Sequence, residues 1–210
     1  VYLMLRRILL DAPISYVKWD MNRNMTEIGS SGLPPQRQKE VSHRYILGLY
    51  EILERLTSEF PNILFESCAS GGNRFDPAML YYMPQTWASD NTDAIERLKI
   101  QYGTSMIYPL SSMAAHVSAV PNHQVRRTTP LETRFAVSTF GMLGYELDLN
   151  KLSEDKLCKI KEQIKFYKDY RGLIQNGRFY RLSSPYNSNR VTWMVVSEDR
   201  KEAILGYYKI

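Results

Sequence analysis

Short strand-like runs alternate with helical patterns over the first 110 residues of the chain. The strand-like runs span residues 15–20, 63–68, 85–90 and 106–109. Between the first two, apolar side chains recur from Val41 to Phe60 at the spacing of an amphipathic helix. A second helix is expected after the third run, with Thr92 or Asp93 as its N-cap and Glu96 placed for a capping box. Strands that alternate with helices predict parallel βα units and an α/β fold.

The second half of the chain has a different pattern. Residues 111–130 are rich in Ser, Ala, Pro, His and Asn, and predict a long loop with short helical turns. Two helices are expected next, the second with Ser153 as its cap. After Gly177, strand-like runs joined by polar turns predict an antiparallel meander over residues 179–182, 191–196 and 203–210. We therefore place a domain boundary near Gly177.

Composition excludes several classes of protein. Of 210 residues, 44% are hydrophobic and 12% are aromatic, which excludes a disordered chain, and no apolar run approaches the ~18 residues of a membrane span. The net charge is +5, but the basic residues are scattered, so no nucleic-acid partner is expected. The two cysteines, Cys68 and Cys158, lie far apart and indicate a reduced, cytoplasmic setting. Neither they nor His43, His116 and His123 have the spacing of a metal site.

Two acidic residues stand at the ends of strand-like runs, close to tryptophan. Asp20 directly follows Trp19, and Asp90 follows Trp87 by three residues. Parallel α/β folds build their active sites at the carboxyl ends of strands. Two carboxylates can act as nucleophile and general acid/base on a sugar, whose C–H face packs on an aromatic ring. A strand-end aspartate also commonly caps a helix or braces a loop, so both interpretations stand on spacing alone.

Further polar residues near these strands have two interpretations each. Lys18 lies on the same side of a strand as Asp20, where it would keep the carboxylate ionised or form a structural ion pair. Cys68 is expected to pack in the core or to contact substrate. A role as nucleophile would require a paired histidine, and none is near it in sequence. Residues 70–72, Ser-Gly-Gly, would let backbone N–H groups approach a ligand or simply turn the chain. His116 and His123 are assigned to one loop, and His43 to the surface.

Five segments of the chain carry distinctive motifs. They are Y-V-K-W-D-M-N-R at residues 16–23, C-A-S-G-G-N-R-F-D at residues 68–76, and the segments over residues 83–97, 111–124 and 144–148. In this order they resemble segments of glycoside hydrolase family 36, the bacterial and fungal α-galactosidases. The first looks like the family's nucleophile motif, the second like its C-x-S/G-G-G-x-R-F-D loop, and the third like its acid/base motif. Asn73, Asn91 and Arg126 depart from the family pattern, Arg126 standing where a glycine is common.

This resemblance implies part of a (β/α)₈ TIM barrel over residues 1–177 and the beginning of an antiparallel β-sandwich domain over residues 178–210. It implies retaining hydrolysis of terminal α-D-galactosyl residues from α-galactosides such as melibiose and raffinose. Asp20 matches the nucleophile and Asp90 the general acid/base. Positions that line the galactose subsite match Lys18, Asn22, Cys68, Ser70, Gly71 and Trp87. No metal, cofactor or membrane partner is implied, and the full-length enzyme is expected to be a homo-oligomer, a dimer or a tetramer.

Three alternatives remain beside this assignment. The same fold can act as an α-N-acetylgalactosaminidase or a transglycosylase, which would be decided near residues 68–73. The chain, which we expect to begin just before the fourth barrel strand, can also be an inert half-barrel fragment. In that case the strand over residues 16–20 would present an unpaired edge, and the isolated chain would be poorly soluble or dimeric, with undetectable activity. A basic nucleic-acid-binding module is the remaining alternative, and the scattered charges argue against it.

Overall fold

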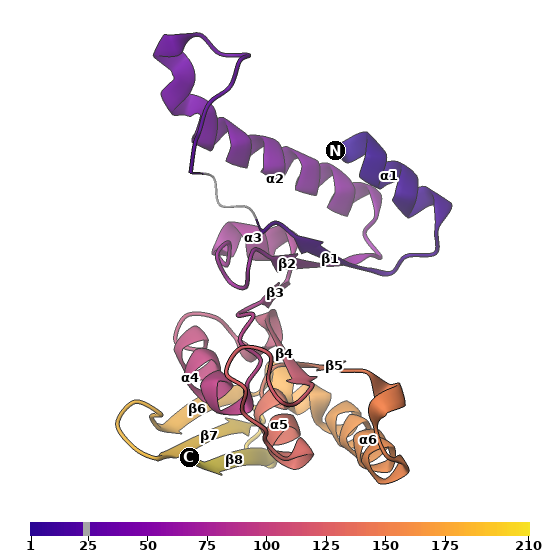
Figure 1. The fold of residues 1–210 in the computed structure, drawn as a ribbon, viewed down its shortest axis with the longest axis vertical. Coiled ribbons are helices and arrows are strands. Elements are labelled where there is room, and N and C mark those ends of the chain that lie inside the picture. Colours follow the sequence, from indigo (N-terminus) through magenta and orange to yellow (C-terminus); the bar gives the residue numbers. More distant parts are fainter. Residues whose placement is uncertain (23–25) are drawn as a thin grey trace. The chain divides into compact units, whose positions relative to one another are not determined.

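A computed structural model describes residues 1–22 and 26–210, so that Arg23 of the first motif lies outside the described residues. The chain divides into two compact units, Val1–Pro84 and Gln85–Ile210 (Figure 1). In the described part, no helix is both long enough and apolar enough to cross a membrane. Each unit has its own apolar core and presents its own group of predicted site residues.

The first unit is a parallel βαβ arrangement preceded by a helix. Strand β1 (Tyr16–Asp20) pairs in parallel with β2 (Leu64–Cys68), and the long helix α2 (Val41–Glu59) connects them after the short η1 (Pro35–Glu40). Helices α1 (Tyr2–Asp11) and α3 (Pro77–Tyr82) complete the unit. The predicted strands and the long helix are confirmed.

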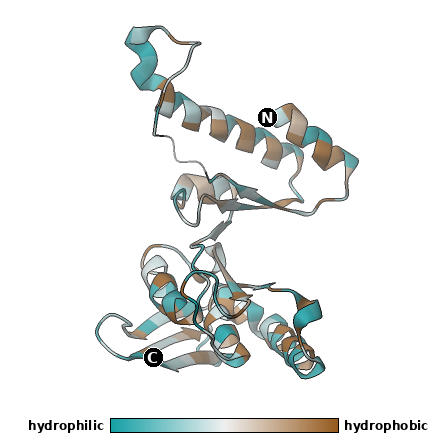
Figure 2. Cartoon of the chain, in the orientation of Figure 1, coloured by the Kyte–Doolittle hydropathy of each residue, from teal (hydrophilic) through white to brown (hydrophobic). Residues whose placement is uncertain are grey.

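The core of this unit forms between α2, β2 and the neighbouring helices. Hydrophobic and hydrophilic segments alternate along α2 in Figure 2, and Leu49, Leu53 and Leu56 on one face are buried. They pack with Leu9 of α1, Phe65 of β2, Met79 of α3 and Met83 after it. Burial of this apolar stripe fixes α2 against the strands, as its sequence period predicts.

The second unit begins with three parallel strands. Strand β3 (Gln85–Trp87) pairs with β4 (Met113–Ser118), which pairs with β5 (Met142–Glu146). Helix α4 (Ala94–Thr104) connects the first two, followed by the short η2 (Leu110–Ser112), and α5 (Leu131–Ser138) connects the last two. Asp93 is the N-cap of α4, since its Oδ1 accepts hydrogen bonds from the backbone N–H groups of Ile95 and Glu96.

The fourth strand does not lie at residues 106–109, where the sequence pattern predicts it. Residues 106–108 lie in a turn after α4, and the strand is β4, inside the segment that was expected to be a loop. Strand β4 reads Met-Ala-Ala-His-Val-Ser, with only one β-branched residue, so its composition does not indicate a strand. Its small alanines fit a crowded site, because a Cβ added to Gly141 would lie 2.8 Å from the Ala115 Cβ. His116 therefore belongs to a strand, whereas His123 lies in the loop after it.

Three antiparallel strands complete the second unit. After η3 (Leu149–Lys151) and the long helix α6 (Glu154–Asn176), strands β6 (Arg178–Ser183), β7 (Arg190–Val196) and β8 (Ala203–Lys209) form the predicted meander. Trp193 on β7 is buried in one core with Leu98 of α4 and Met113 of β4. Parallel pairing gives way to antiparallel pairing at Gly177, but this shared core crosses that point. The division into domains at residue 177 stays a prediction.

Candidate active site

Asp20 and Cys68 face each other at the ends of β1 and β2, where they form the last register pair. The Cys68 thiol donates a hydrogen bond to the Asp20 carboxylate, and this is the largest influence that lowers the pKa of Asp20. Asn22 Nδ2 donates a second hydrogen bond to Asp20 Oδ2 at 2.7 Å. The Lys18 charge lowers the pKa of Asp20 as expected, but contributes less than either hydrogen bond.

The thiol of Cys68 is a neutral donor. Burial, followed by its contact with Asp20, raises the pKa of Cys68 to about 11, so the group keeps its proton at neutral pH. A protonated thiol can donate to a carboxylate but is a poor nucleophile. The buried side chain thus has a polar role in addition to the packing role that the sequence suggested.

Asn22 connects Asp20 to the loop after β2. The backbone N–H of Ser70 donates to Asn22 Oδ1 at 2.8 Å, and Ser70 Oγ donates to the Asn22 carbonyl at 3.3 Å. Ser70 and Gly71 both adopt left-handed backbone conformations, with φ values of 51° and 81°. This conformation is costly for a residue with a side chain, and glycine adopts it freely. The structure therefore brings Asp20, Asn22 and Ser70, all predicted site residues, into one hydrogen-bonded group.

Glu66 is a buried acidic residue that was not predicted as a site residue. It lies opposite Lys18 in the register of β1 and β2, with 4.0 Å between Lys18 Nζ and Glu66 Oε1. The hydroxyl of Tyr16 donates to Glu66 Oε2. A buried carboxylate is stabilised by such partners, and it holds the ammonium group of Lys18 on the same strand side as Asp20. Its one sequence signal is an acidic residue inside an otherwise uncharged strand.

A cavity of about 550 Å³ opens beside Asp20 in the first unit. Asp20, Asn22, Tyr45 and Arg74 contribute to its wall. This volume is in the range of small-molecule binding sites. The carboxylate of Asp20 is thus accessible to a ligand of the size of a sugar.

Trp87 and Asp90 lie together in the second unit. Trp87 ends β3 and is only 3% exposed, and its indole Nε1–H donates to Asp90 Oδ1 at 3.0 Å. Asp90 is an exposed residue. Both residues were predicted as site residues. They can form this contact because Asp90 lies only three residues after the strand end at Trp87.

His116 packs against Trp87 from the neighbouring strand. The two ring centroids are 4.5 Å apart, and His116 Nδ1 lies 3.5 Å from Glu146 Oε2 at the end of β5. Gly144 is directly opposite His116 in the register, and a Cβ at Gly144 would come within 2.6 Å of the imidazole ring. The glycine is therefore what leaves room for the histidine beside Trp87.

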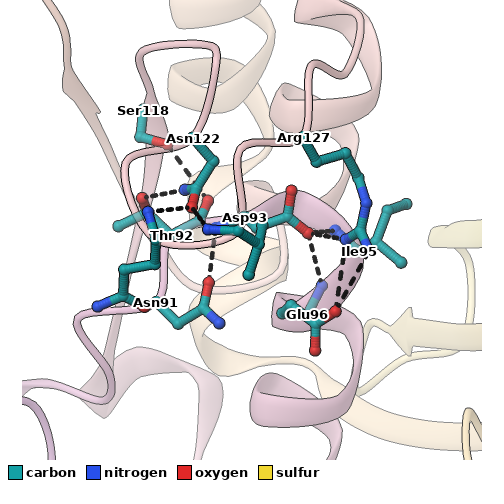
Figure 3. A network of polar contacts seen from close by, with 10 residues as sticks. Asn91, Thr92, Asp93, Ile95, Glu96, Ser118, Asn122 and Arg127 are labelled. Carbon is teal, nitrogen blue, oxygen red and sulfur yellow. Dashed lines mark hydrogen bonds and ion pairs between the residues drawn. The ribbon is translucent and has the colours of Figure 1, made fainter.

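A polar network holds the loop that carries Asp90 (Figure 3). Asn122 Nδ2 donates to Thr92 Oγ1 at 3.1 Å, which ties this loop to the one after β4. Arg127 forms an ion pair with the buried Asp93, and Arg127 Nη1 lies 3.4 Å from Glu96 Oε1. Glu96 thus pairs with an arginine, and the Asp93 N–H donates to Asn91 Oδ1. The expected capping box is replaced by this network, which connects two strand-end loops.

Across residues 1–22 and 26–210, histidine, cysteine and acidic side chains form no cluster of three or more that is suited to a metal ion. The polar groups that the structure does gather are carboxylates with hydrogen-bond donors. Such groups can supply a nucleophile and a proton donor without a metal.

Comparisons with known proteins agree on one family. The family model for Melibiase matches residues 1–177. Over 97% of this chain, the sequence is 63% identical to α-galactosidase AgaA of Geobacillus stearothermophilus. Over 100% of this chain, it is 54% identical to α-galactosidase 1 of Pediococcus pentosaceus. These matches cover 28% and 29% of the two relatives, so the chain spans less than a third of their length.

Solved structures give the same result. The chain matches the crystal structure of α-galactosidase AgaA of G. stearothermophilus with a TM-score of 0.98 and 61% identity, covering 100% of this chain and 29% of that one. The α-galactosidase of Lactobacillus brevis matches with a TM-score of 0.98 and 53% identity, covering 100% and 28%. The expected fold class, later strands of a (β/α)₈ barrel followed by the start of an antiparallel β domain, is confirmed by these matches. With a family model that covers most of its length, the chain belongs to the Melibiase family.

Proposed function

We propose that the complete protein carrying this chain is a retaining α-galactosidase and that the chain supplies both of its catalytic carboxylates. The observation that carries the proposal is the group around Asp20, where a thiol and an amide donate to one accessible carboxylate. The relatives named above support the substrate class. Structures of AgaA variants in complex with raffinose and with stachyose support it further.

Asp20 is the proposed nucleophile. Hydrogen bonds from Cys68 and Asn22 lower its pKa, which keeps the carboxylate ionised at neutral pH. In the first step, a carboxylate oxygen of Asp20 forms a bond to the anomeric carbon of galactose while the bond from that carbon to the glycosidic oxygen breaks. The product is a galactosyl ester on Asp20.

Asp90 is the proposed general acid/base. In the first step its carboxylic acid gives a proton to the departing glycosidic oxygen, and the resulting carboxylate accepts the Trp87 Nε1–H hydrogen bond. In the second step Asp90 takes a proton from water, whose oxygen attacks the anomeric carbon and releases Asp20. Two inversions at this carbon leave galactose with its original configuration.

The remaining predicted site residues are proposed to hold the galactosyl group. Lys18 is held by Glu66 beside the nucleophile, and its ammonium group is suited to a sugar hydroxyl. Asn22 lines the cavity, Cys68 ends β2 beside Asp20, and Ser70 and Gly71 lie in the loop after β2. Trp87 is buried, so its proposed contribution is the indole N–H that it donates to Asp90. The proposed substrates are oligosaccharides that end in α-D-galactose, such as melibiose and raffinose.

The cellular setting and assembly are also proposals. A cytoplasmic location is supported by two free cysteines, one buried and one exposed. We propose that the complete protein is a homo-oligomer, which light scattering on the purified protein tests by its mass.

The function is tested with the complete protein on melibiose and on p-nitrophenyl α-galactoside. We expect hydrolysis of both by the wild type and loss of about 10³-fold or more in Asp20→Asn, because the nucleophile is then an amide. Hydrolysis of neither substrate by the folded wild type would contradict the proposed function.

A further inference from the structure

Arg97 is a buried cation next to the proposed acid/base. It lies on α4, is only 2% exposed, and its guanidinium carbon is 4.6 Å from the centre of the Trp87 ring. Burial lowers the pKa of Arg97 to about 10, whereas the carboxylates of Glu146 and Asp90 raise it. A charge removed from water is costly and is retained only where strong contacts offset the cost.

Arg97 contacts the segment just before Asp90 and the neighbouring strand β4. Arg97 Nη2 donates to the backbone carbonyl of Ser89, the residue before Asp90, at 3.0 Å. Nη1 donates to the carbonyl of Ala114 at 3.4 Å, and Ala114 is the register partner of Trp87. A single planar group thus contacts the indole that donates to Asp90 and the peptide that precedes it. Unlike lysine, arginine combines a flat cationic face with several donors along its edge.

We propose that Arg97 is a positioning residue for Asp90, holding the Trp87 indole and the Ser89 carbonyl so that the carboxyl group points at the glycosidic oxygen. This inference rests on the proposed function. Arg97 does not itself touch the reacting atoms; it acts through the indole and the loop. Proton transfer is sensitive to such orientation, because donor and acceptor must come within hydrogen-bond distance.

Leaving groups of different basicity separate this role from general support of the fold. A sugar leaves as a strongly basic oxygen and needs the proton of Asp90. Dinitrophenolate is a stable anion and leaves without it. General acid catalysis contributes about 10²–10⁴-fold where it is needed. A misplaced Asp90 should therefore impair hydrolysis of melibiose far more than hydrolysis of 2,4-dinitrophenyl α-galactoside.

The experiment measures kcat/KM of the complete protein for these two substrates in Arg97→Lys and Arg97→Met. Lysine keeps the charge but lacks the planar group, and methionine keeps an unbranched apolar chain. The ratio of the two kcat/KM values does not depend on how much of the enzyme is folded, because both substrates meet the same active molecules. We expect the melibiose value to fall at least about tenfold more than the dinitrophenyl value in both variants.

Arg134→Lys is the matched control. Arg134 on α5 is also buried, at 8% exposed, and its Nη1 also donates to a backbone carbonyl of β4, that of Ser118. Its recorded contacts include neither Trp87 nor Ser89. We expect Arg134→Lys to lower both kcat/KM values by the same factor.

Equal losses on both substrates in the Arg97 variants, including complete loss on both, would overturn the positioning role. A selective loss of melibiose hydrolysis in Arg134→Lys would overturn it as well, since any buried arginine would then give the effect. A wild-type protein inactive on both substrates would instead contradict the proposed function, and the inference with it.

Discussion

The thiol of Cys68 donates a hydrogen bond to the carboxylate of Asp20 across the last register pair of β1 and β2. The ionisation of the proposed nucleophile is therefore controlled first by a neutral side chain on the neighbouring strand. Lys18, which precedes Asp20 on its own strand, has a smaller influence on that pKa. This order of influences has a measurable consequence for the pH dependence of catalysis.

Replacement of Cys68 should move the acidic limb of the pH profile. In Cys68→Ala the main hydrogen bond that lowers the pKa of Asp20 is lost, so that pKa rises toward its ordinary value. Because the nucleophile must be ionised, activity should then decline at a higher pH as the solution is acidified. Cys68→Ser keeps a donor and should shift the limb less. The measurement is kcat/KM against pH for the complete protein, and an unmoved limb in Cys68→Ala would count against this control of Asp20.

Loss of the indole donor should impair the proposed acid/base. Trp87→Phe removes the hydrogen bond to Asp90, and a bond to a charged group contributes about 1.5–3 kcal/mol, which corresponds to about 10- to 100-fold in kcat/KM. Trp193→Phe is the matched control, because Trp193 is also buried and also donates from Nε1, there to the Tyr208 hydroxyl at 3.1 Å. If the two variants lost kcat/KM equally while both stayed folded, the Trp87 hydrogen bond would have no special role.

The strand and helix order of the first unit could be predicted because its periodicity is strong. Apolar positions of α2 repeat at helical spacing, and the strands β1 and β2 are short runs with polar ends. Strand β4 could not be predicted in this way. It is nearly all buried and consists largely of alanine, serine and histidine, so neither alternation nor β propensity marks it.

In the candidate site, a contact between residues close in sequence could be predicted, whereas contacts between distant residues could not. Asn22 and Asp20 are near neighbours in sequence, and their contact follows from the motif. Glu66 and Arg97 were not predicted as functional, because each acts through a residue that lies far from it along the chain or on another element. A buried charge in an apolar context is a signal for such residues, but the sequence alone does not show which charges are buried.

Tyr16 should contribute to stability through Glu66. Tyr16→Phe removes the hydroxyl that donates to this buried carboxylate, at an expected cost of about 1–3 kcal/mol in the free energy of unfolding. Tyr180→Phe is the matched control: Tyr180 is 43% exposed against 44% for Tyr16, and the structure records no hydrogen bond of its hydroxyl within the described ranges. Urea denaturation of the complete protein measures both. Equal stability of the two variants would contradict a role of the hydroxyl in holding Glu66.

Arg126 should tolerate glycine. Its φ of 59° lies in the left-handed region, where a side chain costs about 1–2 kcal/mol. Glycine removes that cost but adds about 0.5–1 kcal/mol of backbone entropy, so Arg126→Gly should be neutral or stabilising by up to about 1.5 kcal/mol. Arg126→Val should destabilise, because a β-branched residue fits this conformation poorly. Arg200, with a φ of 60° between β7 and β8, is an independent second site. Melting temperatures that fell in both Arg126→Gly and Arg200→Gly would contradict the expected strain.

Azide rescue tests whether Asp20 is the nucleophile of a retaining enzyme. In Asp20→Gly of the complete protein, the carboxylate is gone and a small anion can take its place at the anomeric carbon. With dinitrophenyl α-galactoside and added azide, we predict that cleavage returns and that NMR identifies the product as β-galactosyl azide, formed by a single inversion. Retained turnover of Asp20→Gly without azide, yielding α-galactose, would show that Asp20 is not the nucleophile.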